Sequence, residues 1–219
     1  MRSMVVILVV VLISVALSVG LRREPADRAR LLRREGLGIV IVLGVLGTAF
    51  IAGETFDDPG GWAAVGLVAS WLVPMLALGV LAWTRPPAAT PVLAVLTALI
   101  VAMSLWLAVQ PGGWRSVEDD VGPIRALAAF AVVVPLGLLG WRRPRPAGVM
   151  LLVAGLVPVL AVLAVDLGST RGVAGTSVGA VAAPAVTAGA LYLAAAALDR
   201  RPVPPDARRP RLRRRPKTA

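Results

Sequence analysis

The sequence predicts an all-α fold, a polytopic transmembrane bundle of seven helices with its N-terminus outside and its C-terminus in the cytoplasm. Of the 219 residues, 58% are hydrophobic, and the mean hydropathy is +0.82. Soluble domains are roughly 45–50% apolar. The apolar residues also form runs of about twenty, the length that an α-helix needs to cross the ~30 Å hydrocarbon core. A soluble helix or strand would interrupt such runs with polar residues, so the bilayer is the predicted solvent.

Seven apolar segments are long enough to span the bilayer, and the second is the shortest. The segments are Met4–Leu21, Leu37–Gly53, Trp62–Thr84, Ala88–Val109, Val121–Trp141, Gly148–Leu167 and Ser177–Leu198. Residues 1–199 are therefore expected to form the bundle. Residues 200–219 are expected to form a basic cytoplasmic tail, and its five prolines predict disorder rather than a regular helix.

The first segment has two interpretations. Ser14-Val15-Ala16 has the small-x-small form of a signal-peptidase site, so residues 1–21 fit a cleaved signal peptide as well as a retained helix. Cleavage would leave the arginines from Arg22 to Arg34 outside, against the positive-inside rule. The retained helix is preferred for this reason, and six mature spans are the alternative.

The charge of the connections alternates along the chain. The predicted cytoplasmic side has 19 basic and 5 acidic residues, and the outer side has 4 basic and 7 acidic residues. An excess of Lys and Arg marks cytoplasmic loops, so the count predicts N-out and C-in. Arginine outnumbers lysine, and Ala, Val, Gly and Pro are abundant, which suggests a GC-rich coding sequence. The expected location is a bacterial cytoplasmic membrane.

Basic residues beside the cytoplasmic ends of the spans are the candidate site. An arginine close to an anionic leaflet gains about 1 kcal/mol. The candidates for contact with anionic lipid headgroups are Arg22, Arg23, Arg142, Arg143, Arg208, Arg209, Arg213, Arg214 and Arg215. RNA or a cytoplasmic partner is the alternative ligand for the C-terminal cluster. Contact with the membrane surface is the simpler explanation of a +11 net charge beside apolar spans, so a nucleic-acid partner is not expected.

Part of the sequence repeats. Leu78–Pro86 matches Leu136–Pro144 at six of nine positions with an offset of 58 residues, and Arg201-Pro202 follows at the same offset. Because the offset covers two helices, it predicts a three-fold repeat of helical hairpins after the first helix, an arrangement known in some transporters. Chance similarity between apolar segments that each end in an Arg-Pro stop is the alternative.

Aromatic and small residues predict packing and anchoring. Trp62, Trp83, Trp106 and Trp141 fall near span ends, where indole rings favour the headgroup layer, whereas Trp71 lies mid-span and is expected to pack between helices. Two sets of small residues four apart predict close helix contacts. These sets are Gly44, Thr48 and Ala52, and Gly175, Gly179, Ala183 and Thr187.

Few residues are suited to chemistry. The chain has no cysteine and no histidine, which excludes disulfides, thiolate nucleophiles and zinc sites built on sulfur or imidazole. No ionisable residue falls mid-span, where a proton-coupled transporter needs one. We therefore expect no enzyme activity, no cofactor and no metal site.

Two functional hypotheses remain. The first is a non-enzymatic scaffold, accessory or sensor protein that contacts lipid and either a membrane-protein partner or a second copy of itself. The alternative is a small-solute transporter or channel. The hairpin repeat suggests transport, as do prolines inside the spans and mid-span hydroxyl groups. These prolines are Pro74, Pro135, Pro158 and Pro184, and the hydroxyls are those of Ser70, Thr97, Ser104 and Thr187.

One stretch resembles a known pattern. Gly53-Glu54-Thr55-Phe56, followed by Trp71, Pro74 and the run from Leu78 to Trp83, is similar to small uncharacterised bacterial multi-pass membrane proteins, grouped only as domains of unknown function. The resemblance covers the second to fifth spans. It implies a membrane bundle and carries over no activity and no site.

Overall fold

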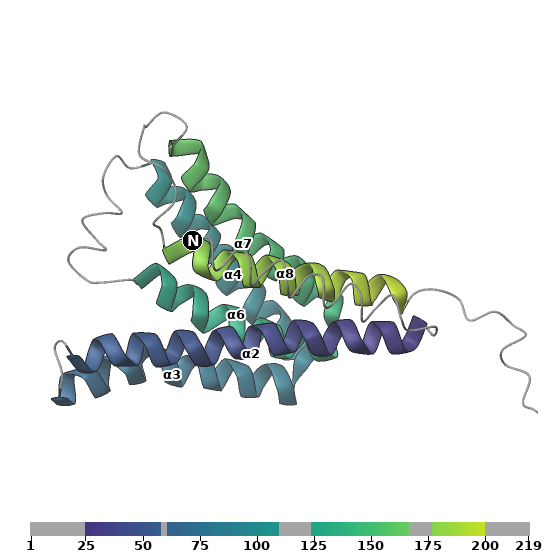
Figure 1. The fold of residues 1–219 in the computed structure, drawn as a ribbon, viewed down its shortest axis with the longest axis horizontal. Coiled ribbons are helices and arrows are strands. Elements are labelled where there is room, and N and C mark those ends of the chain that lie inside the picture. Colours follow the sequence, from purple (N-terminus) through teal and green to yellow (C-terminus); the bar gives the residue numbers. More distant parts are fainter. Residues whose placement is uncertain (1–24, 58–60, 110–123, 167–176, 200–219) are drawn as a thin grey trace, which may run out of the picture.

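The computed structural model describes residues 25–57, 61–109, 124–166 and 177–199. Within these ranges the chain forms six α-helices and no strand, so the all-α class is confirmed (Figure 1). The helices are α2 (Pro25–Asp57), α3 (Gly61–Thr84), α4 (Pro86–Val109), α6 (Ile124–Arg142), α7 (Pro144–Asp166) and α8 (Ser177–Leu198). The predicted first span, Met4–Leu21, and the predicted tail, residues 200–219, lie outside the described residues.

Four of these helices contain a segment long and apolar enough to cross a membrane. The segments are Gly61–Thr84, Pro86–Trp106, Pro144–Ala161 and Val181–Leu198. The apolar part of α6, Ala129–Arg142, is shorter, and α2 carries charged residues in its first turns. The composition and these four helices fit a membrane protein, while the full number of spans stays a prediction.

Helix α2 begins well before the predicted second span. The sequence predicts a connection before Leu37, and this prediction is wrong, because the helix starts at Pro25. Proline is favoured at the first helical position, and the carboxylate of Asp27 suits the positive end of the helix dipole. Ala29 and Leu32, three residues apart, are buried in a cluster with residues of α8. At 1.5 Å per residue, the 33-residue helix is about 50 Å long, more than the hydrocarbon core requires.

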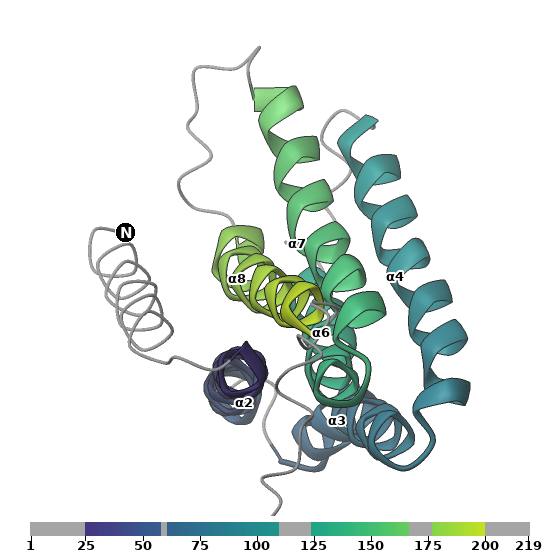
Figure 2. The ribbon, with the colours of Figure 1, turned by 90° about the vertical axis from the view of Figure 1, so that its right-hand side faces the viewer.

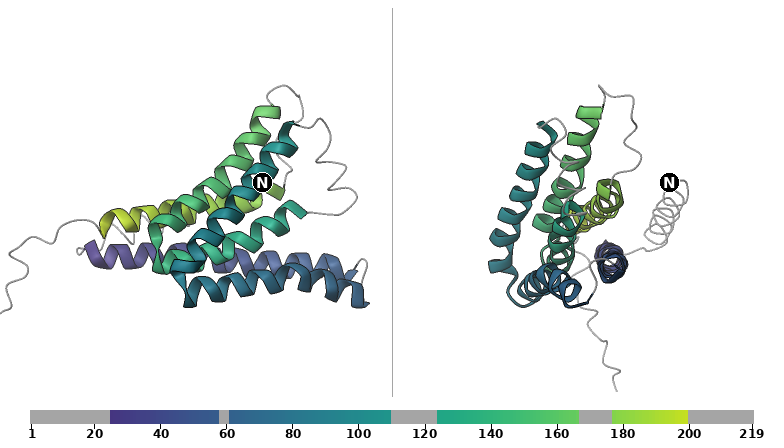
Figure 3. Two further views of the ribbon diagram at one scale, coloured as in Figure 1. Left: turned by 180° about the vertical axis from the view of Figure 1, so that it is seen from behind. Right: turned by 90° about the vertical axis from the view of Figure 1, so that its left-hand side faces the viewer.

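The helices form two groups that differ in direction. Helices α2, α3, α6 and α8 run along the long axis of the molecule, and α4 and α7 lean away from them (Figure 1). Helices α4 and α7 pack against each other, and α4 lies at the outer edge in both end-on views (Figures 2 and 3). Half of the α8 span is buried inside the bundle, against 17% of the α4 span. Of the four candidate spans, that of α8 is therefore the most buried and that of α4 the least.

Helix α6 is the centre of the packing, although it is the shortest of the described helices. It contacts each of the other five. Its inward residues Val133, Leu136 and Leu139 are almost completely buried in the main hydrophobic cluster. Gly44, which lies on a predicted packing face of α2, meets this helix, because a Cβ atom at Gly44 would lie 2.8 Å from Val134 Cγ2.

Helices α7 and α8 touch through their backbones. A Cβ atom built on Gly148 would lie 2.9 Å from the carbonyl oxygen of Gly189, and one built on Gly189 would lie 2.9 Å from that of Gly148. A Cβ atom at Gly155 would lie 3.1 Å from the carbonyl oxygen of Ala182. Such contacts are typical of membrane helices that associate through small residues.

Candidate membrane-surface site

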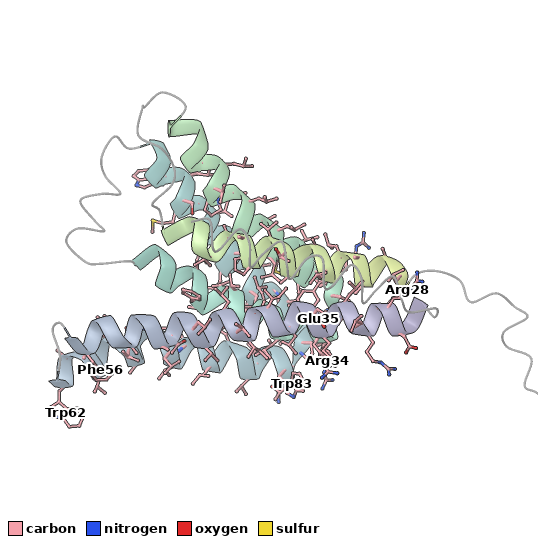
Figure 4. All side chains as sticks on the ribbon, in the orientation of Figure 1. Arg28, Arg34, Glu35, Phe56, Trp62 and Trp83 are labelled. Atoms are coloured by element: carbon pink, nitrogen blue, oxygen red, sulfur yellow. The ribbon has the colours of Figure 1, made fainter. Side chains whose placement is uncertain are left out.

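Eleven charged residues lie at one end of the bundle, which we call the charged end. The helices alternate in direction, so the start of α2 meets the ends of α3, α6 and α8 there (Figure 1). Figure 4 labels Arg28, Arg34, Glu35 and Trp83 at this end, and Phe56 and Trp62 at the opposite one. The charged residues are Asp27, Arg28, Arg30, Arg33, Arg34, Glu35, Arg85, Arg142, Arg143, Arg145 and Asp199.

Two turns at the charged end have the same construction. Arg85 is the only residue between α3 and α4, and Arg143 is the only residue between α6 and α7. The Arg85 N–H donates to Leu81 O at 2.8 Å, and the Arg143 N–H donates to Leu139 O at 2.7 Å, so each arginine continues the helix before it. Both arginines lie at equivalent positions of the predicted 58-residue repeat.

The carbonyl groups of these arginines join the helices that follow. Arg85 O accepts from the N–H of Ala88 at 3.1 Å and of Ala89 at 3.0 Å, and Arg143 O accepts from the N–H of Ala147 at 3.3 Å. Prolines begin both helices, which removes N–H groups that would otherwise lack a partner in the first turn. Few backbone N–H groups at these one-residue turns therefore lack a partner, so the turns can lie at the edge of an apolar layer.

Helix α8 departs from this pattern. Helix α6 packs chiefly on α3, its counterpart in the predicted repeat, whereas α8 packs chiefly on α7 and α2 and only lightly on α6. The predicted repeat units are the hairpins α2–α3, α4–α6 and α7–α8, so Arg85 and Arg143 link successive units, and the two links are alike in their backbone hydrogen bonds. The three-fold repeat stays a prediction.

A cation–π contact joins the two turns. The guanidinium carbon of Arg142, the last residue of α6, lies 5.2 Å from the centroid of the Trp83 ring near the end of α3. Both side chains are exposed. Contact with the ring face leaves the N–H groups at the edge of the guanidinium free to donate hydrogen bonds.

The turn arginines have no acidic partner among the described residues. Arg85, Arg142, Arg143 and Arg145 are all exposed, and no carboxylate of the described ranges forms an ion pair with them. The three described carboxylates at the charged end lie on α2 and directly after α8. Arg85 and Arg143 at the two turns, Arg142 at the end of α6 and Arg145 in the first turn of α7 therefore form a patch, which we call the turn-arginine patch.

The other part of the charged end contains an ion pair. Arg33 Nη2 on α2 donates to Oδ1 and Oδ2 of Asp199, both at 2.9 Å, and this joins residues 166 positions apart. Beside the pair, Leu32 and Ala29 of α2 are buried with Leu191 and Ala195 of α8 in a second hydrophobic cluster. These contacts fix the start of α2 against the end of α8.

Tyr192 connects three helices beneath this ion pair. Its hydroxyl group donates to Gly137 O of α6 at 2.7 Å, and the whole residue is buried. A Cβ atom at Gly36 of α2 would lie 3.3 Å from the ring, and one at Gly140 of α6 would overlap it. Glycines on two helices thus make room for the one tyrosine of the chain.

The mid-span hydroxyl groups bond to their own helices. Thr97 donates to Leu93 O at 2.7 Å, and Thr187 donates to Ala183 O at 2.8 Å. Ser70 and Ser104 likewise donate to the carbonyl groups of Leu67 and Ile100. Thr97 and Thr187 are buried, and Ser70 is exposed on the outside of α3.

One mid-span polar group stands apart from these hydroxyls. Trp71 packs in the main cluster, as predicted from its position, and is 7% exposed. Its buried indole Nε1 has no hydrogen-bond partner in the described part of the chain. An unpaired buried N–H costs about 1–3 kcal/mol, so this group is suited to a ligand or water that supplies an acceptor.

Of the predicted site residues, the structure describes two, the sequence neighbours Arg142 and Arg143, and both are exposed at the turn between α6 and α7. The other predicted residues, Arg22, Arg23, Arg208, Arg209, Arg213, Arg214 and Arg215, lie outside the described residues. The sequence did not predict the contacts of Trp83, Arg33 and Asp199. For Trp83, the repeat was an available signal, since Trp83 and Trp141 each lie two residues before the arginine of an Arg-Pro stop. The ion pair has no signal in a single sequence.

No protein-family model, no curated protein and no solved structure matches this chain. The resemblance of residues 53–83 to bacterial membrane proteins of unknown function therefore stays a prediction. The described helices and their charged end are therefore the features that indicate a function.

Proposed function

We propose that this chain is a seven-span protein of a bacterial cytoplasmic membrane, with its N-terminus outside and its charged end in the cytoplasm. We propose further that it acts as a non-enzymatic scaffold, accessory or sensor subunit. The separation of polar from apolar groups supports this function most directly. The eleven charged residues named above lie at one end, and the mid-span hydroxyls of Ser70, Thr97, Ser104 and Thr187 bond to their own helices.

The outer surface of the α3–α4 hairpin supports a scaffold role. Exposed apolar residues follow helical spacing along α3, at Val73, Leu76 and Val80, and along α4, at Val95, Leu99 and Met103. Only 22% and 17% of the two spans are buried within the chain. Lipid or a second membrane protein covers such a surface in the bilayer.

Cysteine accessibility in intact cells tests the topology, because the chain has no native cysteine. A membrane-impermeant thiol reagent should label cysteines at Ser3, Thr55 and Ser116 and leave one at Thr218 unlabelled until the cells are permeabilised. Labelling of the Thr218 position in intact cells would show that the proposed orientation is wrong.

Photo-crosslinking tests the scaffold role. A photoreactive residue at Leu99 on the outside of α4 should form protein adducts in cells, with a partner or with a second copy. The matched control is Val153, which is 37% exposed on α7 and lies off the α3–α4 surface. Lipid adducts alone at Leu99 would contradict the scaffold role and leave the topology untouched.

Transport of a small solute is the second candidate. The unpaired Trp71 Nε1 favours it, because a solute with a hydrogen-bond acceptor would satisfy this group. The similar turns at Arg85 and Arg143, which would link the predicted hairpin units, favour it as well, since many transporters are built from repeats. Thr97→Cys and Thr187→Cys test it, because both positions are buried. Labelling of either from the aqueous phase would favour transport, and protection of both would favour the scaffold.

A further inference from the structure

The turn-arginine patch lies directly above an apolar surface. Trp83 is near the end of α3, and the exposed side chains of Val80, Leu76 and Val73 follow it along the same helix toward the middle of the span. The Trp83 ring, the guanidinium groups of the patch and the exposed apolar stripe of α3 thus form one continuous surface. A ligand that fits it has an anionic group joined to a long apolar chain.

We propose that the turn-arginine patch and Trp83 bind the phosphate of an anionic phospholipid, whose acyl chain lies along the exposed stripe of α3. This inference rests on the proposed function only in placing the patch at a membrane surface. Guanidinium groups match the geometry of phosphate oxygens and donate two parallel hydrogen bonds to them. Trp83 holds the Arg142 guanidinium in place, which reduces the entropy lost when the phosphate binds.

The charge distribution favours this patch over the rest of the charged end. Four arginines in the two turns have no carboxylate partner among the described residues. On α2, four arginines are accompanied by Asp27 and Glu35, and Asp199 beyond α8 pairs with Arg33. A diffuse electrostatic attraction to an anionic leaflet would depend equally on the arginines of both regions. Binding at a defined patch depends on the turn arginines and on the ring.

Free phosphate and acidic peptides share only the anionic group with a lipid. Neither would use the apolar stripe that begins at Val80. An anionic phospholipid uses both parts of the surface, and a zwitterionic lipid adds a cationic group that four arginines would repel. The patch therefore favours phosphatidylglycerol over phosphatidylcholine.

Native mass spectrometry of the purified full-length chain tests this inference. The protein is taken from vesicles of phosphatidylcholine and phosphatidylglycerol, and the bound lipid is measured after detergent extraction. The wild type should retain phosphatidylglycerol in preference to phosphatidylcholine. Arg142→Gln should lower this retention by about tenfold, because it removes the two charge-assisted hydrogen bonds.

Two further variants separate a defined site from diffuse attraction. Arg30→Gln removes the same charge from an exposed position on α2 and should change the retention by no more than about twofold. Trp83→Leu keeps every charge and should lower the retention by about threefold, since it releases the guanidinium from the ring. Helical content and melting temperature should match the wild type in both variants.

Four results would overturn the inference. They are equal losses for Arg30→Gln and Arg142→Gln, unchanged retention in Trp83→Leu, equal retention of both lipids, and displacement of the lipid by inorganic phosphate. Mass spectrometry does not depend on which side of the membrane the patch faces. A reversed topology in the cysteine experiment would therefore contradict the proposed orientation without touching the lipid site.

Discussion

The two parts of the charged end use arginine in different ways. At the junction of α2 and α8, Arg33 pairs with Asp199 beside a buried apolar cluster, and Tyr192 fills the space between three helices one layer below. At the two turns, Arg85 and Arg143 are exposed single-residue links without an acidic partner among the described residues. The first region stabilises the contact between helices, and the second presents charge to the surroundings.

This difference shows how one residue type can serve structure and surface within the same layer. An arginine that has a carboxylate partner contributes to the packing of the helices around it. An arginine without such a partner contributes little to folding, and its charge remains available for a ligand. If the comparison is correct, substitutions in the α2–α8 region should change stability, and those in the turns should not.

The largest effect is expected for Gly140→Ala. A methyl group there would overlap the ring of Tyr192, so the helices must separate. We expect a loss of about 1–3 kcal/mol of unfolding free energy, the usual cost of overpacking. Denaturation by SDS in mixed micelles measures it. Gly38→Ala on α2 is the control, because nothing lies within 4 Å of the added atom, and equal losses in both variants would contradict this packing.

A smaller effect is expected for Tyr192→Phe. The substitution keeps the ring between its glycines and removes only the hydrogen bond from the hydroxyl group to Gly137 O. Hydrogen bonds between membrane helices contribute about 0.6 kcal/mol on average, and up to about 1.7. The same SDS titration should therefore show a loss of that size. An unchanged stability would mean that the bond contributes nothing to the α6–α8 contact.

The ion pair should contribute less. The side chains of Arg33 and Asp199 are 27% and 40% exposed, so solvent screens their attraction. A double-mutant cycle with Arg33→Gln and Asp199→Asn should give a coupling of about 0.2–1 kcal/mol, the range of exposed pairs. Added salt should reduce this coupling. A coupling that does not respond to salt would point to packing rather than charge.

The smallest effect is expected for Arg143→Gln in the α6–α7 turn. The side chain is exposed, and its backbone hydrogen bonds to Leu139 and Ala147 do not depend on the side chain. Stability in lipid-free micelles should stay within about 0.5 kcal/mol of the wild type. A loss as large as that of Gly140→Ala would abolish the distinction between the two regions.

The fold class and the approximate extent of the apolar helices could be predicted from the amino-acid sequence. The predicted segment Ser177–Leu198 coincides with α8, and Trp62–Thr84 differs from α3 by one residue. These features are local, because the length of an apolar run and an Arg-Pro stop are properties of neighbouring residues. The start of α2 was missed although Pro25, Asp27 and the spacing of Ala29 and Leu32 indicated it, since the charges there resemble a cytoplasmic loop.

The contacts between residues far apart in the sequence depend on how the helices pack. Arg33 and Asp199 are separated by 166 positions, and Tyr192 and Gly137 by 55. Arg142 reaches Trp83 because α6 packs on α3. In a bilayer every apolar helix face is compatible with lipid, so hydropathy does not select its neighbours. The close approach of backbones at small residues helps to select them, and the packing of α6 on α3 and of α7 on α4 brings the two arginine turns side by side.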